Sequence, residues 1–170
     1  MSVRVTLALS ASLFIVGLGN SATAATHGAA ASATNWADDR LDAAKVDYYF
    51  STMEKITDYA MKHPDADLDA IAMDGSETEA DYAKRMNADP KLRAIFTATG
   101  IDPLRYANVT GVMTGTMFGV GLAGKNVDAA KLPQAAQYYL AHKAQIDGRM
   151  AAFQAKAKAM AKQMGIDDSE

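Results

Sequence analysis

The sequence predicts an all-α fold, a compact bundle of five or six helices around a central helix over residues 103–123. Apolar residues recur at spacings of three and four in several segments, which is the period of an amphipathic helix. Helix start signals, among them Asp-Pro pairs, precede these segments. No alternating run of β-branched and aromatic residues indicates a strand. Short connections favour a mostly antiparallel arrangement.

The first 24 residues have the three parts of an export signal. A short start with Arg4 precedes an apolar run over residues 5–19, and Ala22-Thr23-Ala24 offers a small-residue cleavage site. The run is too short for a spanning helix. We expect cleavage after Ala24, although further small-residue sites leave the boundary open. A disordered mature N-terminus over residues 25–34 and a periplasmic or secreted location are then expected.

The remainder, residues 35–165, is predicted to be a single helical domain of ordinary size. Loss of Arg4 with the signal leaves 16 basic and 20 acidic residues and a net charge of −4, which excludes the basic footprint of a nucleic-acid-binding protein. The chain has 0 cysteines, so disulfides, thiolate metal clusters and cysteine nucleophiles are excluded.

A long amphipathic helix is expected over residues 36–62. Asn35 or Thr34 is the expected N-cap, because short polar side chains accept hydrogen bonds from the free amides of the first turn. His63-Pro64 is expected to end the helix, since the residue before a proline avoids the helical conformation. Trp36 is interpreted as a packing anchor at the helix entrance.

Shorter helices are expected next. Alternating aspartates over residues 65–69 resemble the start of a calcium loop, but the glycine and glutamate that such a loop needs at its sixth and twelfth positions are missing. Ser76 and Glu79 form a capping box for the following helix. Asp89-Pro90 and Asp102-Pro103 then each place an aspartate cap before a proline at the first helical position.

Small residues recur at every fourth position of the central helix. Glycine inside a helix costs roughly 1 kcal/mol against alanine, so glycines at this spacing indicate the close approach of another backbone. Gly115→Leu should then overpack the bundle and destabilise it by about 1–3 kcal/mol. The large apolar side chains are expected on the other, buried faces: Val109, Val112, Met113, Met117, Phe118, Val120 and Leu122. The predicted helix-packing face consists of Ala107, Gly111, Gly115, Gly119 and Ala123.

A long C-terminal helix is expected over residues 133–164, followed by a frayed tail over residues 166–170. From Ile146 onward its apolar residues alternate spacings of four and three, which is a heptad seam. The seam either folds back on the bundle or pairs with a second chain in a homodimer, and Gly148 marks an expected bend. The candidate dimer seam consists of Ile146, Met150, Phe153, Ala157, Met160 and Met164.

Three segments mark helix ends and starts: Lys62-His63-Pro64, Ala88-Asp89-Pro90-Lys91 and Gly100-Ile101-Asp102-Pro103, which Tyr106 follows. Together they resemble those of small, uncharacterised exported α-helical proteins of Gram-negative bacteria. The resemblance runs from about residue 49 to residue 143. It implies a periplasmic or secreted helical domain, and it brings no activity, ligand or catalytic residue.

Few side chains are suited to catalysis or metal binding. A nucleophile needs a base, and His27 lies in the expected loose N-terminus, while His63 and His142 meet only if the first and last helices pack in register. No catalytic residue, cofactor or metal site is therefore predicted. Met113-Met117 and Met160-Met164 place sulfur atoms on one helix face, as in a soft-metal carrier, but methionine also fills cores.

Residues 106–124 carry no formal charge and are long enough to cross a bilayer. Asn108 and nearby threonines lower the hydrophobicity, which argues against insertion. The favoured hypothesis is an exported, soluble interaction module that binds an unknown protein or a small apolar ligand and has no catalytic activity. The alternatives are a periplasmic carrier of copper or another soft metal, and a membrane-active glycine-zipper protein.

Overall fold

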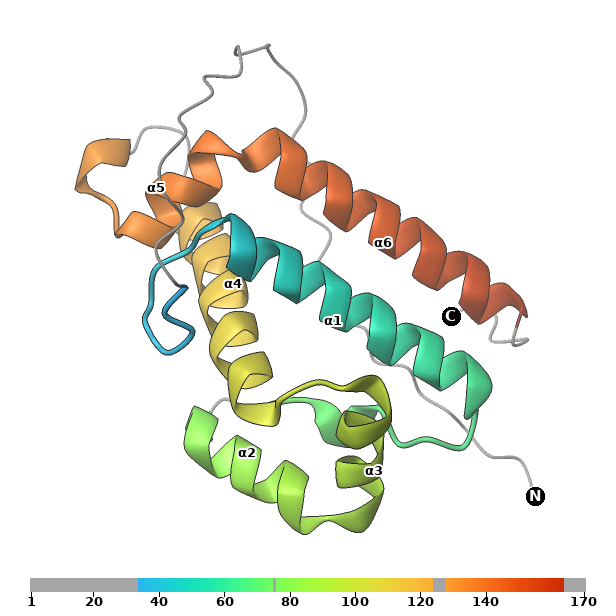
Figure 1. Ribbon diagram of the computed structural model, residues 1–170. Coiled ribbons are helices and arrows are strands. Elements are labelled where there is room, and N and C mark those ends of the chain that lie inside the picture. Colours follow the sequence, from blue (N-terminus) through green and yellow to red (C-terminus); the bar gives the residue numbers. More distant parts are fainter. Residues whose placement is uncertain (1–33, 75, 124–127, 164–170) are drawn as a thin grey trace.

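The computed structural model describes residues 34–74, 76–123 and 128–163, and these ranges contain helices and no strand (Figure 1). The predicted all-α bundle is confirmed. The expected signal peptide, residues 25–33 and the tail over residues 166–170 lie outside the described residues. The elements in chain order are α1 (Ala43–Lys62), η1 (Asp69–Ile71), α2 (Glu79–Ala88), α3 (Pro90–Thr99), α4 (Pro103–Ala123), η2 (Ala129–Lys131), α5 (Gln134–Ala141) and α6 (Lys143–Gln163).

Helix α1 begins at Ala43, seven residues after the predicted start at Trp36. The N-cap is Asp42, whose carboxylate accepts a hydrogen bond from the backbone N–H of Lys45 at 2.8 Å. Asn35 instead accepts from the N–H of Ala37, within a non-helical segment over residues 35–42. This segment makes tertiary contacts, described below, that a continuous helix would not allow. The predicted C-terminus is confirmed, because the N–H of His63 bonds back to the last turn.

The aspartate caps of α3 and α4 are confirmed. Asp89 accepts from the backbone N–H groups of Lys91 and Leu92, and Asp102 accepts from that of Arg105 at 2.7 Å. The predicted capping box of α2 is displaced. Thr78 is the observed cap, because Ser76 donates to the carboxylate of Asp74 in the preceding turn.

The single helix predicted over residues 133–164 is wrong, because the chain turns at His142 and separates α5 from α6. The N–H of His142 bonds to the carbonyls of Tyr138 and Tyr139, and its ring lies 4.3 Å from the ring of Tyr138. The helix continues through Gly148, where a bend was expected. The turn lets α5 pack on α4 while α6 packs on α1.

Two hydrophobic cores lie on α4. The first core joins the start of α1 to α5 and α6, and the second core joins η1, α2 and α3 to the first turns of α4. Because α4 supplies side chains to both, it holds the two halves of the bundle together, as expected for a central helix. The first core contains Leu41, Val46, Tyr49, Phe50, Val109, Met113, Ala135, Tyr139 and Ile146. The second contains Ile71, Tyr82, Met86, Leu92, Ile95, Phe96, Ile101 and Ala107.

Helices α1 and α6 lie side by side and run in the same direction (Figure 1). Asp47 pairs with Arg149 near the starts of both helices, and Asp58 pairs with Lys156 at 3.0 Å further along both. This pair of helices therefore differs from the antiparallel arrangement that was predicted. The reason is that α5 returns the chain to the beginning of α1 before α6 starts.

Candidate functional site

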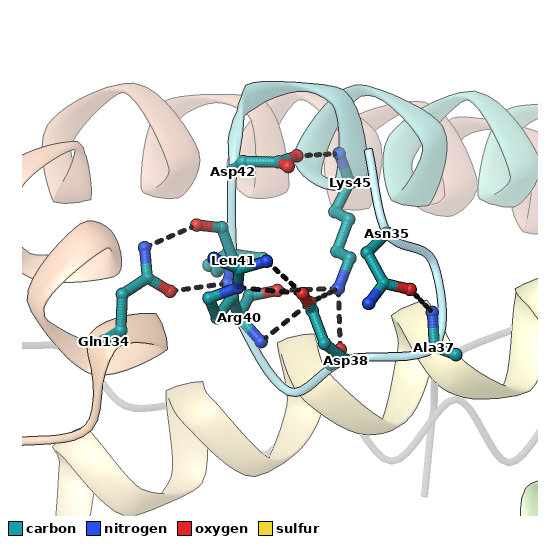
Figure 2. A network of polar contacts seen from close by, with 8 residues as sticks. All are labelled: Asn35, Ala37, Asp38, Arg40, Leu41, Asp42, Lys45 and Gln134. Atoms are coloured by element: carbon teal, nitrogen blue, oxygen red, sulfur yellow. Dashed lines mark hydrogen bonds and ion pairs between the residues drawn. The ribbon is translucent and has the colours of Figure 1, made fainter. Parts of the chain in front are cut away.

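The segment before α1 is fixed by hydrogen bonds of two side chains, Lys45 and Gln134, which the sequence did not predict (Figure 2). Lys45 is 1% exposed, and its Nζ donates to the carbonyl and carboxylate oxygens of Asp38, both at 2.6 Å, and to the carbonyl of Arg40 at 2.8 Å. The side-chain amide of Gln134 accepts from the N–H of Leu41 and donates to its carbonyl, at 2.9 and 3.0 Å. Segment 35–42 is thereby attached to both α1 and α5.

These contacts are structural rather than reactive. The ammonium group of Lys45 has three acceptors for its three protons, so none is left for a ligand. The hydrogen bonds from Lys45 and then Arg40 lower the pKa of Asp38 from 3.8 to about 2. Asp38 is therefore a stable anion at neutral pH, without the proton affinity of a general base.

Arg85 on α2 has a similar role in the second core. Its guanidinium donates to both carboxylate oxygens of Glu77 and to the carbonyls of Ala70 and Ala72, at 2.7 to 2.9 Å. Its bond to Glu77 lowers the pKa of that carboxyl group below its usual value. Arg85 thus closes the loop around η1 onto α2, and it too is occupied by the chain itself.

The outward side of α4 is different, because large apolar side chains lie there without a cover. Phe118 is 67% exposed, Leu122 is 73% exposed and Leu104 is 45% exposed. At about 100° per residue, these three share a narrow face with two of the glycines. We call this face the exposed stripe: Leu104, Gly111, Gly115, Phe118 and Leu122.

Within the described chain, no other backbone approaches the second half of the predicted glycine face. A Cβ atom built on Gly115 or Gly119 would meet nothing within 4 Å, and one on Gly111 would meet only Oε1 of Glu79 at 3.8 Å. Ala107, by contrast, is buried in the second core, and Ala123 is partly buried. The row is buried at Ala107, and α2, which begins at Glu79, reaches it beside Gly111, which is itself exposed.

Phe118 and Leu122 were predicted to be buried, and the structure corrects this. The true buried side of α4 carries Val109 and Met113, with Met117 packed beside them. Helical geometry gives a signal that was missed, since residues seven and eleven positions after Gly111 fall on the same face as Gly111. The large residues therefore continue the glycine row instead of opposing it.

The charged residue at the start of α4 does not reach the exposed stripe. The guanidinium of Arg105 lies 4.5 Å from the ring of Trp36 and 5.6 Å from the ring of Tyr48, and the two rings are 5.2 Å apart. Trp36 is thus a packing anchor, here between segment 35–42 and α4. Residues 106–123 carry no formal charge, so α4 adds no charge to the stripe from Gly111 to Leu122, and the nearest carboxylate there is that of Glu79 beside Gly111.

The heptad seam of α6 is used within the chain. Ile146 lies in the first core, Phe153 and Met160 are buried, and Met150 and Ala157 are partly buried. Arg149 stacks on Phe50 of α1 at 4.4 Å. Of the two alternatives, the structure therefore shows the fold-back onto α1. Met164, the last predicted member of the seam, lies outside the described residues.

The residues considered for metal binding lie apart or in the core. Because α1 and α6 are parallel, His63 at the end of α1 and His142 before α6 lie at opposite ends of the pair. Met113 is fully buried and Met117 packs against the same core. In the part of the chain that the structure describes, no group of three or more His, Cys, Asp or Glu side chains is placed to hold a metal ion.

Two surface pockets contain no residue of the exposed stripe, and both linings mix charged and apolar residues. One is bordered by Asp69, Asp74, Glu77 and Arg85, and the other lies between Arg93 and Asp102. Within the described ranges, no helix combines the length and apolar character needed to span a bilayer. No protein-family model, no curated protein and no solved structure matches the chain.

Proposed function

We propose that this chain is an exported helical interaction module, without catalytic activity, that binds a protein partner through the exposed stripe of α4. The observation that carries the proposal is the exposure of Phe118 and Leu122, at 67% and 73%, on the same face as Gly111 and Gly115. Large apolar groups that lie together on a surface mark interaction sites more often than single exposed ones do.

The shape of the stripe favours a protein over a small apolar ligand. Small-molecule sites are concave and enclose most of the ligand. The stripe is one side of a single helix, and a Cβ atom at Gly115, in the middle of the stripe, would meet nothing of the described chain within 4 Å. A helix or strand of a partner can cover such a face, as amphipathic helices do in groove recognition.

Export is proposed from the first 24 residues, which have the charged start, apolar run and small-residue site of a secretion signal. The mass of the protein isolated from the cell envelope or medium tests this. We expect the chain to start at Ala25. A full-length chain confined to the cytoplasm would contradict it.

Site-specific photo-crosslinking tests the binding surface. A photoreactive amino acid at Phe118 should give a covalent protein adduct in cells that produce the chain. The same group at Met61 is the matched control, because Met61 is 40% exposed and apolar but lies at the end of α1. Adducts at Phe118 alone support the proposal, and no adduct at Phe118, or equal adducts at both positions, contradicts it.

A further inference from the structure

We infer that the partner of the exposed stripe is a second copy of this chain, paired antiparallel through α4 about a two-fold axis. The inference rests on the proposed function, since it names the partner of that same surface. It is independent of the α6 seam, whose residues Ile146 and Phe153 are buried within one chain.

The stripe is complementary to itself. Its second half carries the large side chains Phe118 and Leu122, four residues apart, and its first half carries Gly111 and Gly115, also four residues apart. An axis midway between residues 116 and 117 places Phe118 of one copy opposite Gly115 of the other, and Leu122 opposite Gly111. Each pair of projecting side chains then meets a pair of positions without side chains, as an isologous contact requires.

The glycines give this pairing an energetic reason. Glycine in an exposed helix costs roughly 0.5–1 kcal/mol against alanine. Within the described chain, no close packing offsets that cost at Gly115 and Gly119, because a Cβ atom there would have free space. A second helix packed on the stripe offsets the cost, because glycines let two helix backbones approach closely and let the Phe118 ring reach the partner's backbone.

Charge favours pairing between identical copies. Two copies of the mature chain, each with 16 basic and 20 acidic residues and a net charge of −4, repel each other, but residues 106–123 carry no formal charge. Arg105 is stacked on Trp36, and the carboxylate of Glu79 lies beside Gly111 at the edge of the stripe. Antiparallel pairing therefore buries apolar surface without placing like charges opposite each other at its centre.

Cysteine cross-linking tests the register, since the native chain has 0 cysteines. In the inferred pair, residue 111 of one copy faces residue 122 of the other, whereas the two copies of residue 111 are about 16 Å apart along the axis. A disulfide needs Cα atoms within about 7 Å. A mixture of Gly111→Cys and Leu122→Cys proteins should therefore form a cross-linked dimer under mild oxidation, and each variant alone should not.

Sedimentation of the wild-type protein over a range of concentrations tests the pairing itself. We expect a monomer–dimer equilibrium, which Phe118→Asp and Gly115→Leu each weaken about tenfold or more. Met61→Asp is the control and should leave the equilibrium unchanged. The far-ultraviolet circular dichroism spectrum of each variant should match wild type, because the stripe contributes little to the fold of one chain.

Three results would overturn the inference: a monomer at all concentrations, cross-linking of either single-cysteine variant with itself, or binding of the stripe to lipid vesicles or a different protein instead of a second copy. A monomer whose residue 118 still cross-links to another protein overturns the pairing and keeps the proposed function. A monomer without adducts at residue 118 overturns both.

Discussion

In the row of small residues on α4, Ala107 in the first half is buried, whereas the second half of the helix packs on α1 and α5 on one side and is exposed on the other. Ala107 in the first half is packed among aromatic residues of the second core. Gly115, eight residues later in the same row of small residues, has free space where a side chain would begin. The same sequence pattern thus serves packing at one end of the helix and an open surface at the other.

Enlarging Ala107 should have the largest effect. Ala107→Leu adds three carbon atoms to a core position that is 1% exposed, so we expect a loss of about 3 kcal/mol of unfolding free energy, measured by urea denaturation. Gly115→Leu is the matched variant on the open side and should lose no stability as a monomer, because the space there is free and leucine favours the helix over glycine. Equal losses for the two variants would mean that the glycine face is packed after all, as the sequence first indicated.

Removing the charge of Lys45 should have the next largest effect, because segment 35–42 brings Trp36 onto Arg105 at the start of α4. Lys45→Met leaves the carbonyls of Asp38 and Arg40 without their donor. We expect a loss of about 2 kcal/mol in urea denaturation, because a hydrogen bond from a charged donor contributes about 1.5–3 kcal/mol.

The control for that change is Arg40→Ala, which removes an ion pair to the same Asp38 carboxylate from a side chain that is 65% exposed. Exposed pairs contribute about 0–1 kcal/mol. A loss as large as that of Lys45→Met would show that burial of Lys45 is not what matters. Faster proteolysis within segment 35–42 of Lys45→Met would locate the effect at this segment.

Acid should loosen the same contact. The pKa of Asp38 is lowered from 3.8 to about 2 in the folded protein, mainly by the hydrogen bond from Lys45. A lowered pKa means that the stabilisation is complete above about pH 4 and is lost as the pH falls from about 4 to about 2. Asp38→Asn cannot titrate, so the stability difference between wild type and this variant should shrink over that interval. A difference that stays constant between pH 5 and pH 2 would contradict the assignment.

The sequence predicted the helices well where a local signal determines them. Asp89 and Asp102 cap α3 and α4 as expected, because an aspartate before a proline acts through the next few backbone amides alone. The start of α1 and the turn at His142 were missed because tertiary contacts determine them. The Lys45 and Gln134 contacts hold segment 35–42 out of the helix, and Gln134 is 93 residues away from its partner Leu41.

The sequence predicted which residues share the candidate face of α4, but it did not predict which elements lie beside that face. The spacing of Gly111, Gly115 and Gly119 predicted a helix face without side chains, and all three glycines lie in α4. That pattern could not show how far along the face α2 extends. Thr78 caps α2, so the helix begins at Glu79, beside Gly111. Whether a smooth face is packed or open depends on what lies opposite, and a pattern within one helix contains no information about its neighbour.

The smallest expected effect is that of Gly115→Ala, which tests helix propensity at a position of α4 where the chain leaves free space. Gly115→Ala should raise the unfolding free energy by about 0.5–1 kcal/mol at protein concentrations low enough to keep the chain monomeric, because alanine fits the free space and favours the helix. Gly100→Ala is the matched control. Gly100 also has free space, but it ends α3 with φ of 65°, so alanine there should destabilise by about 1 kcal/mol. Thermal denaturation of both variants measures whether the unfolding free energy rises for Gly115→Ala and falls for Gly100→Ala. A loss of stability for Gly115→Ala would show that the chain packs closely around Gly115, as it does around Ala107.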